Sequence, residues 1–145
     1  MLNAIQGLLS VAGRVLLAAI FLASAAGNKI PNFNSVVELM GKVGVPAPRL
    51  MLLGAIVFLL VGGVSVVLGF YARLGAFLLL VFLALASHYF HGFWRLEGAE
   101  AMEQQIQFMK NLSMAGAMLF MIANGAGAWS LDARRAAKAP LAARP

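Results

Sequence analysis

The 145-residue sequence contains no cysteine. Disulfide bonds, haem–thiolate ligation, iron–sulfur clusters, cysteine-type zinc sites and thiol redox relays are therefore excluded for this chain alone. Phosphate-binding loops, nucleophile–base pairs and carboxylate dyads are also missing from the sequence, so none of its motifs indicates a hydrolase.

Charged residues are scarce as well. They make up 11% of the sequence, against about 25% in a typical soluble domain, whereas 62% of the residues are hydrophobic. One domain of this length cannot bury so much apolar surface away from water, so the surrounding solvent must be lipid. The net charge of +6 comes from basic residues that stand singly between apolar runs. The expected partner is thus the lipid bilayer with its anionic surface, and not nucleic acid.

Proline is absent from four apolar segments that are each about long enough to cross a bilayer, which takes about 20 residues. The segments cover residues 7–26, residues 50–71, residues 74 to 88 or 91, and residues 111–131. The sequence therefore predicts an all-α, polytopic membrane protein with a bundle of four transmembrane helices. Arg14 and the residues after it resemble a signal peptide, but the segment before Arg14 is itself apolar, so we interpret it as a retained helix.

The connections complete the predicted organisation. Residues 36–43 carry an apolar face, and Asn34 with Ser35 before them can cap a helix, which predicts a short amphipathic interfacial helix between the first two spans. Residues 92–110 form a longer, polar connection. We expect a transmembrane domain over residues 1–132 and a basic, disordered tail over residues 133–145.

Lysine and arginine near the helix ends predict the orientation. Each side of the membrane receives five of them, but the cluster after residue 132 and the position of Arg14 favour both termini in the cytoplasm. The end of the third span, at His88, then faces outward.

Arg14 is the costliest residue in the predicted spans, because a charge at the centre of a membrane helix costs about 2.5–3.5 kcal/mol. It can extend to the lipid headgroups or face the interior of the bundle. Counting inward from the outer helix ends places Asn124 and several glycines at the level of Arg14. We therefore predict that Arg14 points into the bundle near Asn124, with neutral partners: Asn124, backbone carbonyls near glycines, or water.

The outer ends of the helices hold further polar residues. His88 and His91 share a helix face, which allows an interfacial belt, a shared metal or a proton-exchanging His88. Two ligands do not make a metal site, and we expect none. Lys29 and Lys110 at the same end either anchor the protein to headgroups or form a basic vestibule for an anion or for the carbonyls of a ring compound.

Several motifs occur in an order and spacing that resemble the DoxX family of small bacterial membrane proteins. They are GRVLLAAIFLASAAGNKI in the first span, VGVPAP before the second, VLGFYAR after it, HYF at the end of the third, and QFMKNLSMAGAMLF with NGAGAWSLD in the fourth. The resemblance covers residues 13–132 and implies a four-helix bundle. The residues that match the family pattern are Arg14, Lys29, Pro46, Gly69, His88, Lys110, Asn111 and Asp132.

The resemblance also implies a link to quinone and redox chemistry, since one namesake group is a membrane subunit of a thiosulfate:quinone oxidoreductase. Many members carry a glutamate in the second span, whereas residues 58–61 of this chain contain no acid. Any role of that glutamate must be filled otherwise here or not at all.

These observations define one expected binding site. Lys29, His88, Lys110 and Asn111 are predicted to converge on a cavity with Tyr89, Trp94 or Phe108 in its wall. A quinone or phenol ring would accept hydrogen bonds there, and His88 would exchange a proton. The alternative is that these side chains reach separately to headgroups and loop backbone.

The predicted function is that of a quinone-binding or quinone-reactive component of a redox system in the bacterial inner membrane. No tightly bound cofactor is expected, and electrons would come from a partner oxidoreductase or from the substrate. The alternatives are a non-enzymatic binder or carrier of a hydrophobic molecule or lipid, and a membrane anchor for a soluble oxidoreductase. The residues assign neither a catalytic group nor an oligomeric state, so enzymatic activity and homo-oligomerisation stay open.

Overall fold

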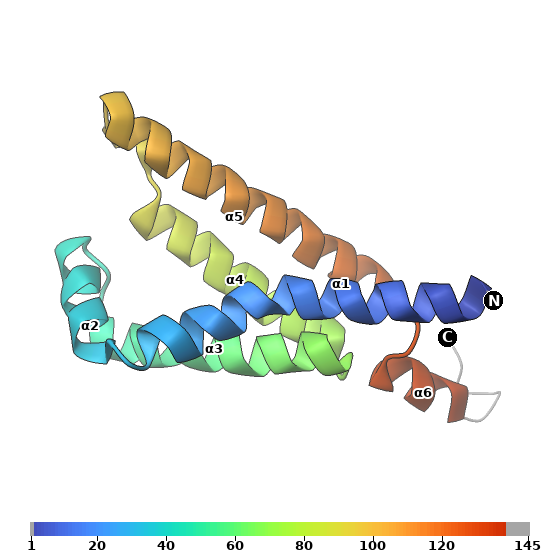
Figure 1. Cartoon of the computed structure of the whole chain (residues 1–145). Coiled ribbons are helices and arrows are strands. Elements are labelled where there is room, and N and C mark those ends of the chain that lie inside the picture. Colours follow the sequence, from blue (N-terminus) through green and yellow to red (C-terminus); the bar gives the residue numbers. More distant parts are fainter. Residues whose placement is uncertain (1, 139–145) are drawn as a thin grey trace.

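The structure is a computed structural model that describes residues 2–138, and their regular elements are all helices (Figure 1). Four of the helical segments are long and apolar enough to cross a membrane. They are α1 (Leu2–Ser24) with its π-helical extension η1 (Ala25–Lys29), α3 (Pro48–Leu68), α4 (Ala72–Phe90) and α5 (Gly98–Asn124). The predicted all-α, four-span membrane fold is therefore confirmed.

The boundaries of the second and third spans follow from backbone chemistry. Pro48 stands in the first turn of α3, where its missing N–H costs nothing. Gly69 ends α3 in the left-handed conformation, with φ of 61°. Only Gly69, Phe70 and Tyr71 separate α3 from α4, so the two helices are antiparallel neighbours.

The fourth span is displaced from its predicted position. The helix begins at Gly98 rather than at Asn111, and it ends at Asn124 rather than at Leu131. The polar segment predicted as a connection is thus mostly helix, after a short 3₁₀ turn, η2 (Phe93–Arg95). The early end has a local cause, because Gly125 and Gly127 both take positive φ angles that stop a helix.

The spans pack as an open array. α1 packs on α3, α3 on α4, and α4 on α5, whereas α1 and α5 make little contact with each other. In Figure 1, α5 and α1 lie close near the end of α5 and diverge toward the other end of the molecule. All four spans still contribute to one buried cluster, with Phe21, Leu59, Leu79, Leu83 and Met118 at its centre.

The predicted amphipathic helix is confirmed as α2 (Phe33–Lys42). Its Met40 is buried with Val45 and Leu52, so its apolar face is packed on the start of α3. The cap differs from the prediction, since Asn32 and not Asn34 or Ser35 occupies the N-cap position.

The chain after Asn124 returns to the start of α1. Residues 125–130 form an irregular segment, and α6 (Leu131–Lys138) follows it beside the end of the α3–α4 pair (Figure 1). Residues 133–138 are helical, which differs from the predicted disorder, because Ser130 caps α6: its hydroxyl accepts a hydrogen bond from Ala133 N at 3.1 Å. The rest of the predicted tail, residues 139–145, lies outside the described residues.

Candidate functional site

Polar side chains gather at the two opposite ends of the helical array. One group lies where α1 meets the irregular segment 125–130, and we call it the Arg14 network: Ser10, Arg14, Trp129, Ser130 and Asp132. The other surrounds the end of η1 and reaches α4 and α5, and we call it the Lys29 end: the polar Ser24, Lys29, Ser87 and Asn111 with the ring of Phe82.

Arg14 is covered by protein, with only 3% of its surface exposed. Its Nη2 donates to the carbonyl oxygen of Trp129 at 3.0 Å, and its Nε donates to Ser10 O at 3.3 Å. Nη1 has no hydrogen-bond partner and lies against Gly69, where a side chain would collide with it. The prediction that Arg14 faces the protein and bonds backbone carbonyls near glycines is confirmed.

Asn124 does not take part in this network. Its amide donates to Phe120 O in the same helix, and the residue is exposed. The estimate of depth was wrong because it counted inward from Asn111 as the outer end of the last span, whereas α5 begins at Gly98. Arg14 lies beside Gly69, at the end of α3, and not level with Gly62 and Gly63 in its interior.

Asp132 joins the Arg14 network to the turn between α3 and α4. Its two carboxylate oxygens accept from the backbone N–H groups of Tyr71 and Ala72, each at 2.9 Å. Its own N–H donates to Gly69 O at 2.8 Å. The first N–H groups of a helix lack partners within the helix, so Asp132 caps α4 from a distant part of the chain. Its negative charge also attracts Arg14.

The Lys29 end is shaped by the π-helical turn at residues 25–29. The wider π turn brings residues five apart onto one face, so Lys29 lies over Ser24, and its Nζ donates to Ser24 Oγ at 2.7 Å. The ammonium lies 5.3 Å from the centre of the Phe82 ring in α4. Lys29 is consequently half-buried and turned toward α4 rather than fully exposed.

Two polar pairs connect α4 to α5 beyond Phe82. Asn111 Nδ2 donates to Ser87 Oγ at 3.1 Å, and His91 Nδ1 lies 2.8 Å from Gln104 Oε1. Lys29 and Asn111 thus contact the same stretch of α4, at Phe82 and Ser87, from different neighbouring helices. Among residues 2–138, no group of three or more histidine, aspartate or glutamate side chains is placed to hold a metal ion.

The other predicted site residues lie farther apart. His88 is exposed and packs edge-to-face on Tyr89, with ring centres 5.0 Å apart. Tyr89 itself packs with the cluster that holds α2. Trp94 and Phe108 are edge-to-face neighbours with ring centres 6.0 Å apart.

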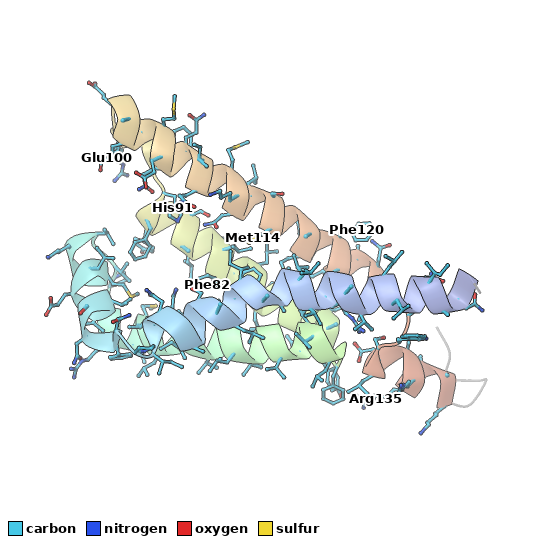
Figure 2. The ribbon with its side chains drawn as sticks, in the orientation of Figure 1. Phe82, His91, Glu100, Met114, Phe120 and Arg135 are labelled. Carbon is cyan, nitrogen blue, oxygen red and sulfur yellow. The ribbon has the colours of Figure 1, made fainter. Side chains whose placement is uncertain are left out.

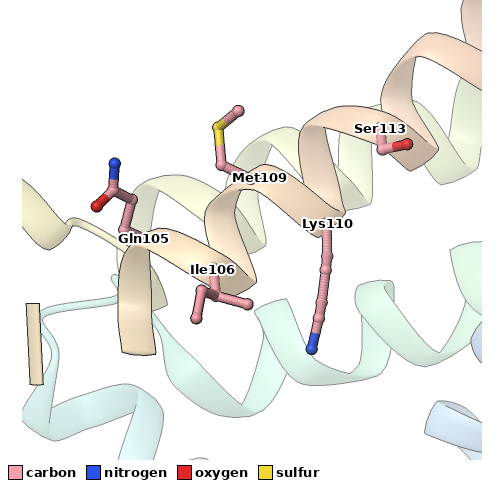
Figure 3. A pocket seen from close by; sticks show the side chains of 5 residues that line it. All are labelled: Gln105, Ile106, Met109, Lys110 and Ser113. Carbon is pink, nitrogen blue, oxygen red and sulfur yellow. The ribbon is translucent and has the colours of Figure 1, made fainter. Parts of the chain in front are cut away.

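Lys110 lies on an exposed face of α5. It lines an open surface hollow of about 500 Å³ whose walls all come from that helix: Gln105, Ile106, Met109, Lys110 and Ser113. Figure 3 shows its side chain leaving the helix on the side opposite to Gln105 and Met109. Lys29, His88 and Asn111 do not line this hollow. Of the predicted set, Lys29 and Asn111 both contact α4, at Phe82 and at Ser87. His88 and Lys110, which adjoin Ser87 and Asn111 in the sequence, are exposed.

Two features of these sites were not found from the sequence. No sequence pattern distinguishes the π-helical turn at residues 25–29 from the end of an α-helix, because its residues AAGNK are compatible with both. The roles of Ser10 and Trp129 depend on a fold-back of the chain, in which Ser10 Oγ donates to Ala126 O at 2.9 Å. The glycines within residues 124–132 could have predicted that this segment is not helical, because glycine disfavours a helix.

The DoxX family model matches residues 9–92. The inner membrane protein YphA of Escherichia coli K12 is 34% identical over 106 residues, which cover 73% of this chain and 76% of YphA. The inner membrane protein YqjF of the same organism is 31% identical over 119 residues, which cover 82% of this chain and 85% of YqjF. No solved structure gives a significant match.

Proposed function

The chain belongs to the DoxX family, and we propose that this multi-pass inner-membrane protein binds a quinone at its Lys29 end as a component of a membrane redox system. The proposal includes binding, orientation and proton exchange by this chain. Electrons reach the bound ring from a partner oxidoreductase, and the chain itself forms no covalent bond with the ring.

The observation that carries the proposal is the environment of Lys29. The residue is the last of a membrane-spanning segment and is turned toward α4, where its ammonium meets the face of Phe82. A lysine at the end of a span usually extends to the headgroups, whereas this one is turned toward the protein. Within residues 2–138, no carboxylate pairs with Lys29, and its recorded hydrogen bond goes to Ser24. An ammonium has three N–H donors, so two remain for a ligand.

The chemistry suits a flat ring with carbonyl oxygens. A quinone oxygen accepts a hydrogen bond from the Lys29 ammonium, and this charge-assisted bond strengthens as negative charge develops on the reduced ring. Asn111 has a second amide N–H beyond the one that it gives to Ser87. His88 follows Ser87 in α4 and is exposed, and its imidazole is the group that we propose to exchange a proton with the ring.

The test is a binding titration of the purified protein in lipid nanodiscs with a short-tailed ubiquinone, followed by quenching of tryptophan fluorescence. Lys29→Met keeps the length of the side chain but removes its charge and donors. Loss of one charge-assisted hydrogen bond, worth about 1.5–3 kcal/mol, predicts a Kd at least about tenfold higher. Lys42→Met on the exposed face of α2 is the matched control and leaves the Kd unchanged. Equal Kd values for the two variants would overturn the proposal.

A further inference from the structure

A long apolar groove runs along the membrane-facing side of the α3–α4 pair, away from the Lys29 end. It has a volume of about 520 Å³, within the range of about 300–1,000 Å³ that is typical of small-molecule sites. Its lining comes from both helices and from the turn between them: Leu60, Val61, Val64, Ser65, Leu68, Phe70, Tyr71, Leu74, Gly75 and Leu78.

The groove exists because small residues line the seam between the helices. Gly62 and Gly75 are buried against each other's backbone, and a side chain at Gly75 would collide with Ser65. The helix backbones therefore approach closely. The larger side chains of Val61, Val64 and Leu74 stand exposed on either side, and a trough lies between them.

Between the two helices, the floor of this groove offers no free polar group. Of the two side-chain hydroxyls in its lining, Ser65 Oγ lies 2.6 Å from Phe70 O and 3.1 Å from Tyr71 O and donates toward these carbonyls, and the other belongs to Tyr71 at the end of the groove. A ring with carbonyl oxygens that lay between the helices would find no donor there. The groove therefore suits a hydrocarbon chain, which needs apolar contact alone.

The end of the groove at the membrane surface is cationic. Phe70 and Tyr71 close it, and the Arg135 guanidinium of α6 lies 5.2 Å and 4.9 Å from the centres of their rings. Figure 2 shows Arg135 on α6 beside the end of the helical pair. Within residues 2–138, Arg135 pairs with no carboxylate, and Asp132 of the same helix is engaged by Tyr71 and Ala72. Arg134 and Lys138 add to the positive charge.

We infer that the α3–α4 groove binds one anionic phospholipid. An acyl chain lies between Val64 and Leu74, and the phosphate bonds the edge of the Arg135 guanidinium. A guanidinium stacked on aromatic rings keeps its in-plane N–H donors, whose fork matches two phosphate oxygens. The net positive charge on α6 favours the binding of a lipid with an anionic headgroup over one with a zwitterionic headgroup.

The experiment is native mass spectrometry of the full chain in a mild detergent with equal amounts of phosphatidylglycerol and phosphatidylcholine of the same chain length. The unmodified protein retains phosphatidylglycerol about fivefold more than phosphatidylcholine, the ratio expected for one basic side chain at an anionic headgroup. Arg135→Gln removes most of this preference, since only the more distant charges of Arg134 and Lys138 then remain on α6. Arg134→Gln, the neighbouring exposed residue without a ring contact, keeps it.

A second pair of variants tests the groove itself. Val64→Trp fills it and lowers the retention of both lipids. Val57→Trp, on the same exposed face of α3 but outside the groove, does not. Circular dichroism and the elution volume establish that each variant is folded. The inference fails if Arg135→Gln and Arg134→Gln behave alike, or if a folded Val64→Trp retains lipid normally. It also fails if Val64→Trp breaks a dimer without releasing lipid, since the groove would then hold a second copy.

Discussion

Replacement of Asp132 tests whether a residue from beyond the last span holds the α3–α4 turn in place. Its carboxylate accepts from Tyr71 N and Ala72 N at 2.9 Å each, and each hydrogen bond to a charged group contributes about 1.5–3 kcal/mol. Asp132→Ala removes both acceptors from two N–H groups at the start of α4. The free energy of local opening there should fall by about 3 kcal/mol, the lower end of the summed range.

Hydrogen–deuterium exchange at single-residue resolution measures this change directly. Since about 1.4 kcal/mol corresponds to a factor of ten, the Tyr71 and Ala72 amides should exchange about 100-fold faster in Asp132→Ala. Asp132→Asn keeps one acceptor oxygen, and its effect should be intermediate. Glu38→Gln removes an exposed acid from α2 and serves as the control. Unchanged exchange at both amides in Asp132→Ala would refute the capping role.

Two further substitutions probe the interior. Arg14→Lys cannot reproduce the bond from the guanidinium to Trp129 O, so thermal unfolding in detergent should show a loss of about 1.5–3 kcal/mol, whereas the exposed Arg49→Lys should stay within about 0.5 kcal/mol. Gly75→Val places a branched side chain against Ser65 and should destabilise the protein by about 1–3 kcal/mol or more, and a normal unfolding temperature would show that the helices are less closely packed than described.

The spans and the amphipathic helix follow from composition because lipid imposes a simple rule. A segment that crosses the bilayer must be long, apolar and helical, and each of these properties can be counted along the chain. The polar start of α5 did not obey this rule, since residues 98–110 are helical without being apolar throughout. Their alanine, glutamate, glutamine and methionine are strong helix formers. Helix propensity therefore predicts a helix at residues 98–110, where hydropathy alone does not.

The candidate sites were harder to predict because they depend on chain segments that meet only in the fold. The burial of Arg14 follows from the cost of a charge in lipid, but its acceptor, Trp129 O, lies 115 residues away. Counting residues from helix ends selected Asn124 instead, and this error arose from an incorrect helix boundary. In the same way, an α-helical reading of residues 24–29 does not place Lys29 over Ser24, because only the π turn aligns residues five apart.

The two ends of the helical array differ in how their polar groups are used, and this difference favours the Lys29 end as the place of binding. At the Arg14 network, the side chains of Ser10, Arg14 and Asp132 all bond backbone groups, and Gly69 is closed off by direct contact with the guanidinium. Such a network fixes the chain, and the one Arg14 nitrogen without a hydrogen-bond partner, Nη1, is buried against Gly69. At the Lys29 end, donors of Lys29 and Asn111 remain beyond the bonds that they make within the protein. We therefore propose that the Arg14 network holds the helices in place and that a ligand is bound through the spare donors of the Lys29 end.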